Sequence, residues 1–261
     1  MNTPLIIGHR GASAVAPENT LAAFREAVAV GADGIEFDVR LTRDGVPVVI
    51  HDRDLRRTGG LSQRIADMTS SELAKVDVGS WFSRSFSNES VPRLAELFEL
   101  FRGNNSAMYL EMKCDSPAEY APLAEACCRL IAEHGLKERV MIECFQLPAL
   151  RVVREIDSEI RTVALFEPSI SDPSVLSDQR VINKAIDVGA VAVALHHRLT
   201  RRGLVEKAKA AGMHVAIWTV DDPSWIERAR TLGIDALITN NPSKCFKQTY
   251  CRGGPPWPPG V

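Results

Sequence analysis

The stretch "LTRDGVPVV", residues 41–49, decides the fold. Nine short apolar or β-branched runs in this chain of 261 residues have the character of strands, one more than an eight-stranded barrel needs. An Asp-Gly pair between two such runs is a strong hairpin signal, so Asp44 and Gly45 are predicted to form a two-residue loop. The return strand then runs antiparallel, with His51 opposite Asp38, and eight parallel strands remain.

The other runs alternate with segments of helical period. The predicted strands cover residues 5–8, 34–39, 47–50, 108–112, 140–144, 161–165, 191–195, 214–218 and 236–239. The predicted helices cover residues 19–30, 94–101, 117–133, 148–156, 200–211 and 223–232. Strands that alternate with helices form parallel sheets with crossover connections. We therefore predict an α/β fold, a (β/α)8 TIM barrel, as a single catalytic domain over residues 1–247.

Two further segments need separate treatment. Residues 53–93, after the second barrel strand, are too long for a simple loop and contain a capping box that starts at Thr69, so we predict a small cap insertion. Trp81 and Phe82 would either close this cap over a substrate or anchor it. Residues 248–261 are rich in Pro and Gly and are predicted to be a disordered tail.

Composition limits the classes of function. The net charge of −2 gives no electrostatic reason to bind nucleic acid or an anionic membrane, which favours a small-molecule partner. Six cysteines without a C-x-x-C spacing predict free thiols in a reducing compartment. With no basic, apolar leader and no stretch of about 20 apolar residues, we expect a cytoplasmic protein without stable membrane insertion. The oligomeric state stays open.

Polar side chains follow the ends of several predicted strands. In this class of barrel the active site lies at the carboxyl ends of the strands. Glu36 and Asp38 are two positions apart in one strand, so both point to the same face. The mouth is predicted to collect two histidines, three or four carboxylates and two fixed cations: His9, His51, Glu36, Asp38, Glu111, Asp52, Arg10 and Lys113.

Charge counting favours a metal ion at this mouth. Three carboxylates against Arg10 and Lys113 leave a net charge of −1, which would repel an anion, and one divalent ion changes it to +1. That charge suits a phosphodiester, and a set of carboxylates favours Ca²⁺ or Mg²⁺ over zinc. His9 and His51 suit general acid and base roles because imidazole titrates near neutrality. The alternative is that Glu36 and Asp38 pair with the two cations and no metal is bound.

Five motifs together resemble the glycerophosphodiester phosphodiesterase family. They are "HRGASAVAPENT", "GADGIEFDVRLTRDGVPVVIHD", "LEMK", "AIWTVDD" and "GIDALITNNP", and the match runs over residues 5–242. The resemblance implies hydrolysis of a small-molecule glycerophosphodiester to glycerol 3-phosphate and an alcohol, in lipid and glycerol metabolism. It also implies one metal ion on Glu36, Asp38 and Glu111, and His9 and His51 as the acid and base. The substrate contacts that it implies are Arg10 and Lys113 on phosphate and Trp218 at the glycerol pocket.

Several positions depart from the usual family pattern. Cys144 stands where Ser is frequent, and Arg57, Thr58 and Gly59 where Arg-Thr-Thr is frequent. Asp221 stands where Asn is frequent, and Asn240 where Asp is usual. None of these changes removes a proposed catalytic group. Several are expected to lie near the substrate pocket, so the sequence leaves the preferred alcohol open.

The residues "PENT" at the end of the first motif have two possible roles, in capping a helix and in the site. Asn19 or Thr20 can cap the helix that begins there, and Glu18 can hold Arg10 in place. Capping is the favoured reading.

The sequence leaves the mechanism open. The attack on phosphorus comes either from a glycerol hydroxyl, through a cyclic phosphate, or directly from water, and either histidine can be the acid. Rival functions are a lysophospholipase D or phospholipase C-like enzyme, which needs an apolar groove, and a non-catalytic phosphodiester-binding protein.

Overall fold

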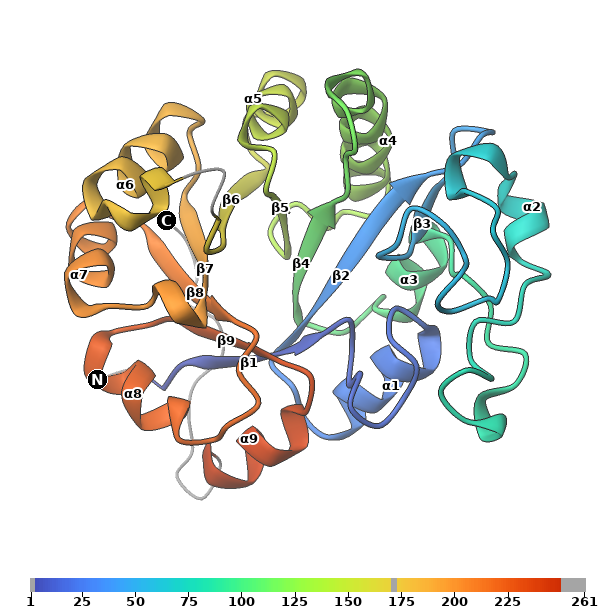
Figure 1. Cartoon of the computed structure of the whole chain (residues 1–261), viewed down its shortest axis with the longest axis horizontal. Coiled ribbons are helices and arrows are strands. Elements are labelled where there is room, and N and C mark those ends of the chain that lie inside the picture. Colours follow the sequence, from blue (N-terminus) through green and yellow to red (C-terminus); the bar gives the residue numbers. More distant parts are fainter. Residues whose placement is uncertain (1–2, 170–172, 250–261) are drawn as a thin grey trace.

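The chain forms a closed barrel of eight parallel strands surrounded by helices (Figure 1). The structure is a computed structural model that describes residues 3–169 and 173–249. Its strands are β1 (Leu5–His9), β2 (Gly34–Leu41), β3 (Pro47–Val49), β4 (Ala107–Met112), β5 (Val140–Cys144), β6 (Arg161–Phe166), β7 (Ala192–His196), β8 (His214–Trp218) and β9 (Ala236–Thr239). The pairing of β1 with both β2 and β9 closes the barrel, while β3 lies outside it, antiparallel to β2. The predicted TIM barrel is confirmed.

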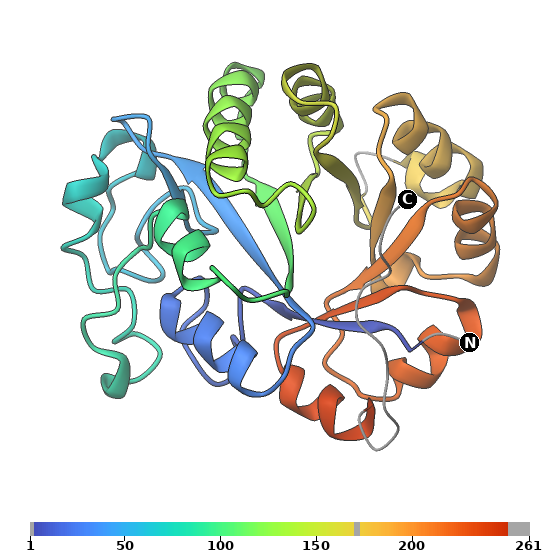
Figure 2. The same ribbon diagram turned by 180° about the vertical axis from the view of Figure 1, so that it is seen from behind.

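The helices form a ring around the strands, as both views show (Figures 1 and 2). They are α1 (Leu21–Ala29), α2 (Ser70–Leu73), α3 (Leu94–Leu100), α4 (Tyr120–Glu133), α5 (Leu147–Ile156), α6 (Asp178–Asp187), α7 (Arg202–Ala210), α8 (Trp225–Leu232) and α9 (Pro242–Thr249). Short 3₁₀ turns are η1 (Ile65–Asp67), η2 (Arg84–Phe86), η3 (Pro117–Glu119), η4 (Pro173–Leu176) and η5 (His197–Leu199). The sequence did not predict α6 or α9. Helix α6 is amphipathic and buries Val181, Ile182 and Ala185.

The loop of the hairpin between β2 and β3 is one residue longer than predicted. Thr42 N donates to Val46 O at 3.1 Å, which leaves a three-residue loop closed by Gly45 at a φ of 71°. Asp38 therefore lies opposite Ile50, whose N–H donates to its carbonyl, and the predicted pairing of His51 with Asp38 is wrong. The tip is held by Asp44, which accepts hydrogen bonds from Ser70. His51 still reaches the mouth because β3 ends two residues earlier.

Successive side chains of a barrel strand point alternately outward and inward. The outward ones form an apolar layer against the helices, and the inward ones form a second layer inside the barrel. Ile35, Phe37 and Val39 of β2 point outward and pack against the helices, so Glu36 and Asp38 point inward as predicted. The barrel interior contains many small side chains: Ala107, Ala192, Ala194, Ala216 and Ala236.

The segment over residues 53–93 packs against β3 beside the barrel (Figure 1). The predicted capping box is present, since Thr69 Oγ1 accepts from Glu72 N and Thr69 N donates to Glu72 Oε2. The indole N–H of Trp81 donates to Val78 O, and its ring packs edge-on against Phe82, which fits an anchor. Whether this insertion acts as a cap stays a prediction.

The predicted tail overlaps the end of the last helix. Helix α9 continues to Thr249, and the rest of the tail lies outside the described residues. Within residues 3–169 and 173–249, no helix combines the length and the apolar character needed to cross a bilayer.

Candidate active site

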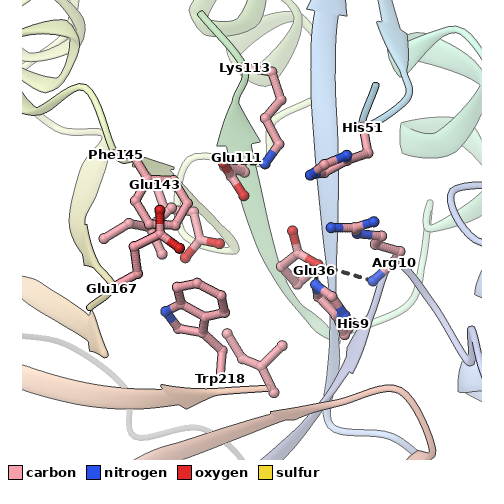
Figure 3. A pocket seen from close by; sticks show the side chains of 12 residues that line it. His9, Arg10, Glu36, His51, Glu111, Lys113, Glu143, Phe145, Glu167 and Trp218 are labelled. Carbon is pink, nitrogen blue, oxygen red and sulfur yellow. Dashed lines mark hydrogen bonds and ion pairs between the residues drawn. The ribbon is translucent and has the colours of Figure 1, made fainter. Parts of the chain in front are cut away.

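A cavity of about 300 Å³ opens at the carboxyl ends of the barrel strands (Figure 3). The predicted site residues among its walls are His9, Arg10, Glu36, His51, Glu111, Lys113 and Trp218. The residues that the sequence did not predict there are Glu143, Phe145, Leu165, Glu167 and Ile238. The structure thus brings the predicted residues together from β1, β2, β4, β8 and the segment after β3. Asp38, which is fully buried, lies behind the wall.

Three buried carboxylates converge in this cavity. Glu36, Glu111 and Glu143 each place an oxygen within 4.8 Å of the others. Glu36 Oε1 and Glu143 Oε2 are buried, and no described group donates a hydrogen bond to them. Oxygens that share one Ca²⁺ at about 2.3–2.6 Å lie at most about 5 Å apart. The donor set, its spacing and its unsatisfied oxygens therefore fit a hard divalent cation.

The electrostatics of these carboxylates also indicate a shortage of positive charge. Burial, with the nearby Asp38 charge, raises the pKa of Glu36 well above its usual value. Burial and the Glu111 charge do the same to the pKa of Glu143. Burial raises the pKa of Glu111 to about 7, although Lys113 opposes this. Without a further cation, burial therefore favours the protonated form of these groups.

Asp38 is held differently from the other three. Its Oδ1 lies 3.1 Å from Lys113 Nζ, and its Oδ2 lies 3.1 Å from Arg10 Nε. Asn19 Nδ2 donates to Oδ2 at 2.7 Å. Burial opposes ionisation, but Lys113 and Arg10 lower the pKa of Asp38 far below its usual range. Asp38 is therefore the anionic anchor of both cations, and its predicted role as a metal ligand stays a prediction.

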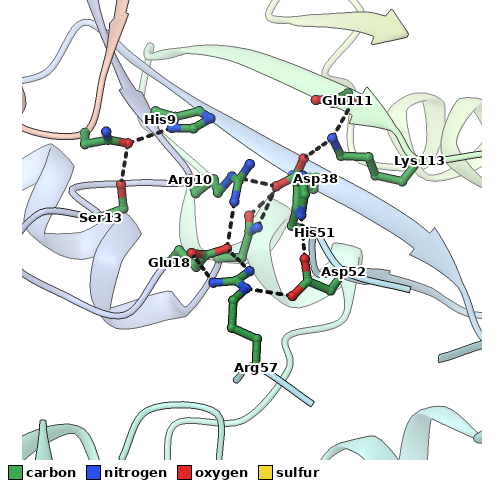
Figure 4. A network of polar contacts seen from close by, with 12 residues as sticks. His9, Arg10, Ser13, Glu18, Asp38, His51, Asp52, Arg57, Glu111 and Lys113 are labelled. Atoms are coloured by element: carbon green, nitrogen blue, oxygen red, sulfur yellow. Dashed lines mark hydrogen bonds and ion pairs between the residues drawn. The ribbon is translucent and has the colours of Figure 1, made fainter. Parts of the chain in front are cut away.

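The "PENT" segment serves both the helix and the site. Thr20 caps α1 by accepting from Ala23 N. Asn19 instead adopts a φ of 57° and binds Asp38. Glu18 Oε1 accepts from Arg10 Nη1 at 2.8 Å and so holds Arg10 in place (Figure 4). The favoured interpretation, that Asn19 or Thr20 caps the helix, is thus confirmed by Thr20.

Arg57 joins two parts of the site. It donates to both oxygens of Glu18 and, through Nε, to Asp52 Oδ2 at 2.7 Å (Figure 4). Asp52 Oδ1 in turn lies 2.7 Å from Nδ1 of His51. This network connects the loop after β1 to the loop after β3, and it positions Arg10 and His51 together.

The two histidines have different partners. His51 Nδ1 contacts a carboxylate, and burial lowers the pKa of His51 despite the Asp38 charge nearby. His9 Nδ1 contacts the amide oxygen of Asn240 at 2.7 Å. Burial, followed by the Arg10 charge, lowers the pKa of His9 to about 4. Burial therefore favours the neutral form of both rings before any substrate binds.

Trp218 forms an aromatic wall on the other side of the cavity. Its ring packs edge-on against Phe145 at 5.5 Å and His196 at 5.0 Å, and its indole N–H donates to Ala194 O. Lys113 Nζ lies 5.8 Å from the Phe145 ring. Figure 3 shows the rings of Phe145 and Trp218 at the cavity wall, together with Lys113.

Glu143 is the most important site residue that the sequence did not predict. A signal was available, because Glu143 is a lone carboxylate in the apolar strand β5 and pairs in register with Glu111. Asn240 was missed as a partner of His9 because 231 residues separate the two.

Comparison with known proteins identifies the family. A sequence profile of the glycerophosphoryl diester phosphodiesterase family matches residues 9–244. The chain belongs to this family. It is therefore a hydrolase of the glycerophosphodiester phosphodiesterase class, as the resemblance implied. Asn240 Nδ2 donates a hydrogen bond to Asp221 Oδ2 at 2.8 Å.

Similar proteins support the same family over almost the whole chain. A glycerophosphodiester phosphodiesterase from Caldanaerobacter subterraneus subsp. tengcongensis is 34% identical over 238 residues, which cover 91% of this chain and 94% of the relative. A phosphodiesterase from Oleispira antarctica, solved in complex with the product sn-glycerol-3-phosphate, superposes with a TM-score of 0.84. It is 27% identical, with 94% of this chain and 96% of that chain covered. A glycerophosphoryl diester phosphodiesterase structure from Silicibacter pomeroyi gives a TM-score of 0.85 at 27% identity, covering 95% and 94%.

Proposed function

We propose that this phosphodiesterase hydrolyses small glycerophosphodiesters to glycerol 3-phosphate and an alcohol, with one Ca²⁺ or Mg²⁺ ion held by Glu36, Asp38 and Glu111. We propose Glu143 as a further carboxylate beside this ion. One observation carries the proposal: unsatisfied carboxylate oxygens face two histidines and two fixed cations in one cavity. The similar Oleispira antarctica structure, which contains sn-glycerol-3-phosphate, supports the choice of substrate.

The charge of the site supports a cation. The four buried carboxylates Glu36, Asp38, Glu111 and Glu143, counted against Arg10 and Lys113, leave a net charge of −2 when all four are ionised. A divalent ion neutralises this charge and removes the electrostatic barrier to a phosphodiester anion. When bound, the ion would supply Lewis-acid stabilisation of charge on the phosphoryl oxygens.

The protein's own groups divide the remaining work. Arg10 and Lys113, held by Asp38, bind the phosphoryl oxygens and stabilise the negative charge that develops in the transition state. His9 and His51 line the same cavity, where one accepts a proton from the attacking group, a water molecule or a glycerol hydroxyl, and the other donates one to the leaving alcohol. After attack by a glycerol hydroxyl, water opens the cyclic phosphate in a second step. Trp218 packs against the glycerol carbons.

A panel of glycerophosphodiesters tests this function. The wild-type protein is assayed with added Mg²⁺, with added Ca²⁺ and with chelator, with glycerol 3-phosphate as the measured product. We expect release that requires an ion and is lost in His9→Ala and His51→Ala, while both variants keep the wild-type circular dichroism spectrum. Near-normal turnover in either histidine variant would contradict the acid and base assignment.

The cellular setting follows from the same chemistry. Products of this type belong to lipid and glycerol metabolism, and the proposed compartment is the cytoplasm. The free thiols of Cys114, Cys127, Cys128 and Cys144 support a reducing environment.

A further inference from the structure

We propose that Asp221 and Asn240 form a positioning pair that fixes the tautomer of His9, so that the neutral ring exchanges protons only through Nε2. This inference rests on the proposed function, because it gives His9 its direction as an acid or base. The pair follows two neighbouring strands: Asp221 lies in the loop after β8, and Asn240 comes directly after β9, which pairs with both β8 and β1.

The contacts form a chain of hydrogen bonds. Asn240 Oδ1 lies 2.7 Å from Nδ1 of His9 and accepts from Ser13 Oγ at 3.0 Å. Asn240 Nδ2 donates to Asp221 Oδ2 at 2.8 Å. Asp221 Oδ1 accepts from the backbone N–H of Asn240 at 2.8 Å and from Thr239 Oγ1 at 3.0 Å.

The chemistry of each side chain determines which atom donates and which accepts in these hydrogen bonds. A carboxylate accepts hydrogen bonds and cannot donate them, so Asp221 requires the NH₂ group of Asn240. The amide oxygen of Asn240 must then face His9, and an amide oxygen also accepts only. The shared proton therefore sits on Nδ1 of His9, and in the neutral ring Nε2 carries the lone pair.

The free nitrogen faces the cavity. His9 Nε2 lies 3.8 Å from Glu36 Oε2, which is too long for a hydrogen bond. His9 also lines the cavity that holds the three carboxylates. The nitrogen selected by the pair is thus the one that a substrate hydroxyl or a water molecule can reach.

Asp221→Asn is the informative single substitution. The oxygen of the new amide must stay toward the backbone N–H of Asn240, so its NH₂ group faces the side chain of Asn240. That side chain then turns round and presents its own NH₂ group to His9, which forces the proton to Nε2. We expect kcat to fall by about 10²–10⁴-fold, the usual contribution of general acid–base catalysis, with little change in KM.

The double variant Asp221→Asn with Asn240→Asp swaps the two side chains. It restores a hydrogen-bond acceptor at position 240 that faces Nδ1 of His9. The amide at position 221 donates to the carboxylate at position 240, which accepts from Nδ1 of His9. We expect kcat to recover most of the loss seen in the single variant. Asp222→Asn is the matched control. Asp222 is exposed and accepts a hydrogen bond from Ser224 N, but it takes no part in the hydrogen bonds between Asp221, Asn240 and His9, so its substitution should leave kcat unchanged.

Nitrogen NMR of ¹⁵N-histidine-labelled protein reads the tautomer directly, at a pH where the ring is neutral. Loss of one signal among six histidines in His9→Gln assigns His9. We expect a protonated Nδ1 in the wild type and the double variant, and a protonated Nε2 in Asp221→Asn. A wild-type ring with its proton on Nε2, or a single variant with unchanged tautomer and kcat, would overturn the inference. Failure of the proposed function looks different: the wild type releases no product, whatever its tautomer.

Discussion

Lys113 Nζ lies 2.6 Å from Oε1 of Glu111, two residues away on the same edge of the barrel. The contact places a fixed cation directly on a carboxylate that is proposed to bind a metal ion. Lys113 and the ion therefore compete for the same negative charge, while both attract the substrate phosphate.

Lys113→Met separates these two effects. Removing the ammonium group leaves more uncompensated negative charge, so we expect the affinity for Ca²⁺ to rise by at least about tenfold in calorimetric titration. The phosphate contact is lost at the same time, so kcat/KM should fall by about 10²–10³-fold.

Lys137→Met is the control for this experiment, because Lys137 pairs with Asp157 and Glu159 on the outer surface. Lys137→Met should change neither the Ca²⁺ affinity nor kcat/KM. An unchanged Ca²⁺ affinity in Lys113→Met would show that the ion binds away from Glu111.

Glu143→Gln tests the carboxylate that the sequence did not predict. It keeps the side-chain volume but removes one negative charge, so Ca²⁺ affinity should fall by about 10–100-fold. The ion-free protein should become more stable at pH 8, because a buried carboxylate that raises the pKa of its neighbours is gone. Glu167→Gln, at an exposed carboxylate of the same mouth, should show a much smaller loss of affinity. Equal effects from both substitutions would argue against a special place for Glu143.

The stability of the ion-free protein should fall as pH rises. The pKa of Glu111 is about 7 in the folded chain against a usual 4.5, so the folded state binds more protons than the unfolded state in this window. Its contribution to the free energy of unfolding is full below about pH 4.5 and is lost as the pH rises through about 7.

Added Ca²⁺ should reverse this loss, with an increase in Tm that grows with pH, because an ion displaces protons from the carboxylates. Thermal unfolding from pH 5 to pH 8, with and without Ca²⁺, measures both trends. An ion effect that is the same at all pH values would contradict the proposed ligands.

Gly11→Ala tests the turn that follows His9 and Arg10. Gly11 has a φ of 82°, and a methyl group there would lie 2.6 Å from the backbone carbonyl carbon of Ala23. We expect the free energy of unfolding to fall by about 2–5 kcal/mol, from the left-handed backbone and the clash together.

Gly45→Ala is the matched comparison for Gly11→Ala. Gly45 has a similar φ of 71°, but among the described residues no atom lies within 4 Å of the place that its methyl group would take. It should lose only about 1–2 kcal/mol in urea unfolding. Equal losses in the two variants would show that the clash with Ala23 is relieved.

The parts of the fold that could be predicted are those set by local sequence. The strand period placed Glu36 and Asp38 on the inner face, and the Asp-Gly pair showed that one of nine strands lies outside the barrel. The predicted loop was one residue too short, because the Thr42 side chain bonds Asp44 and Val46 across a three-residue loop, and Ser70, 26 residues from Asp44, donates to the same loop.

The parts of the site that could not be predicted depend on contacts between distant segments. Asn19 has a residue type that suits a helix cap, and its contact with Asp38 becomes visible only once α1 is packed on β2. The partner of His9 lies 231 residues away, so the direction of its proton could not be read from the sequence.

The central claim is that an ion on these carboxylates is needed for phosphodiester hydrolysis at this mouth. The most direct test is a titration of chelator-treated protein with Ca²⁺, and in parallel with Mg²⁺, that records bound ions per chain and glycerol 3-phosphate release on the same samples. We predict no release without an ion and a rate that rises in proportion to occupancy until one ion is bound per chain. Full-rate release from ion-free protein would contradict the account.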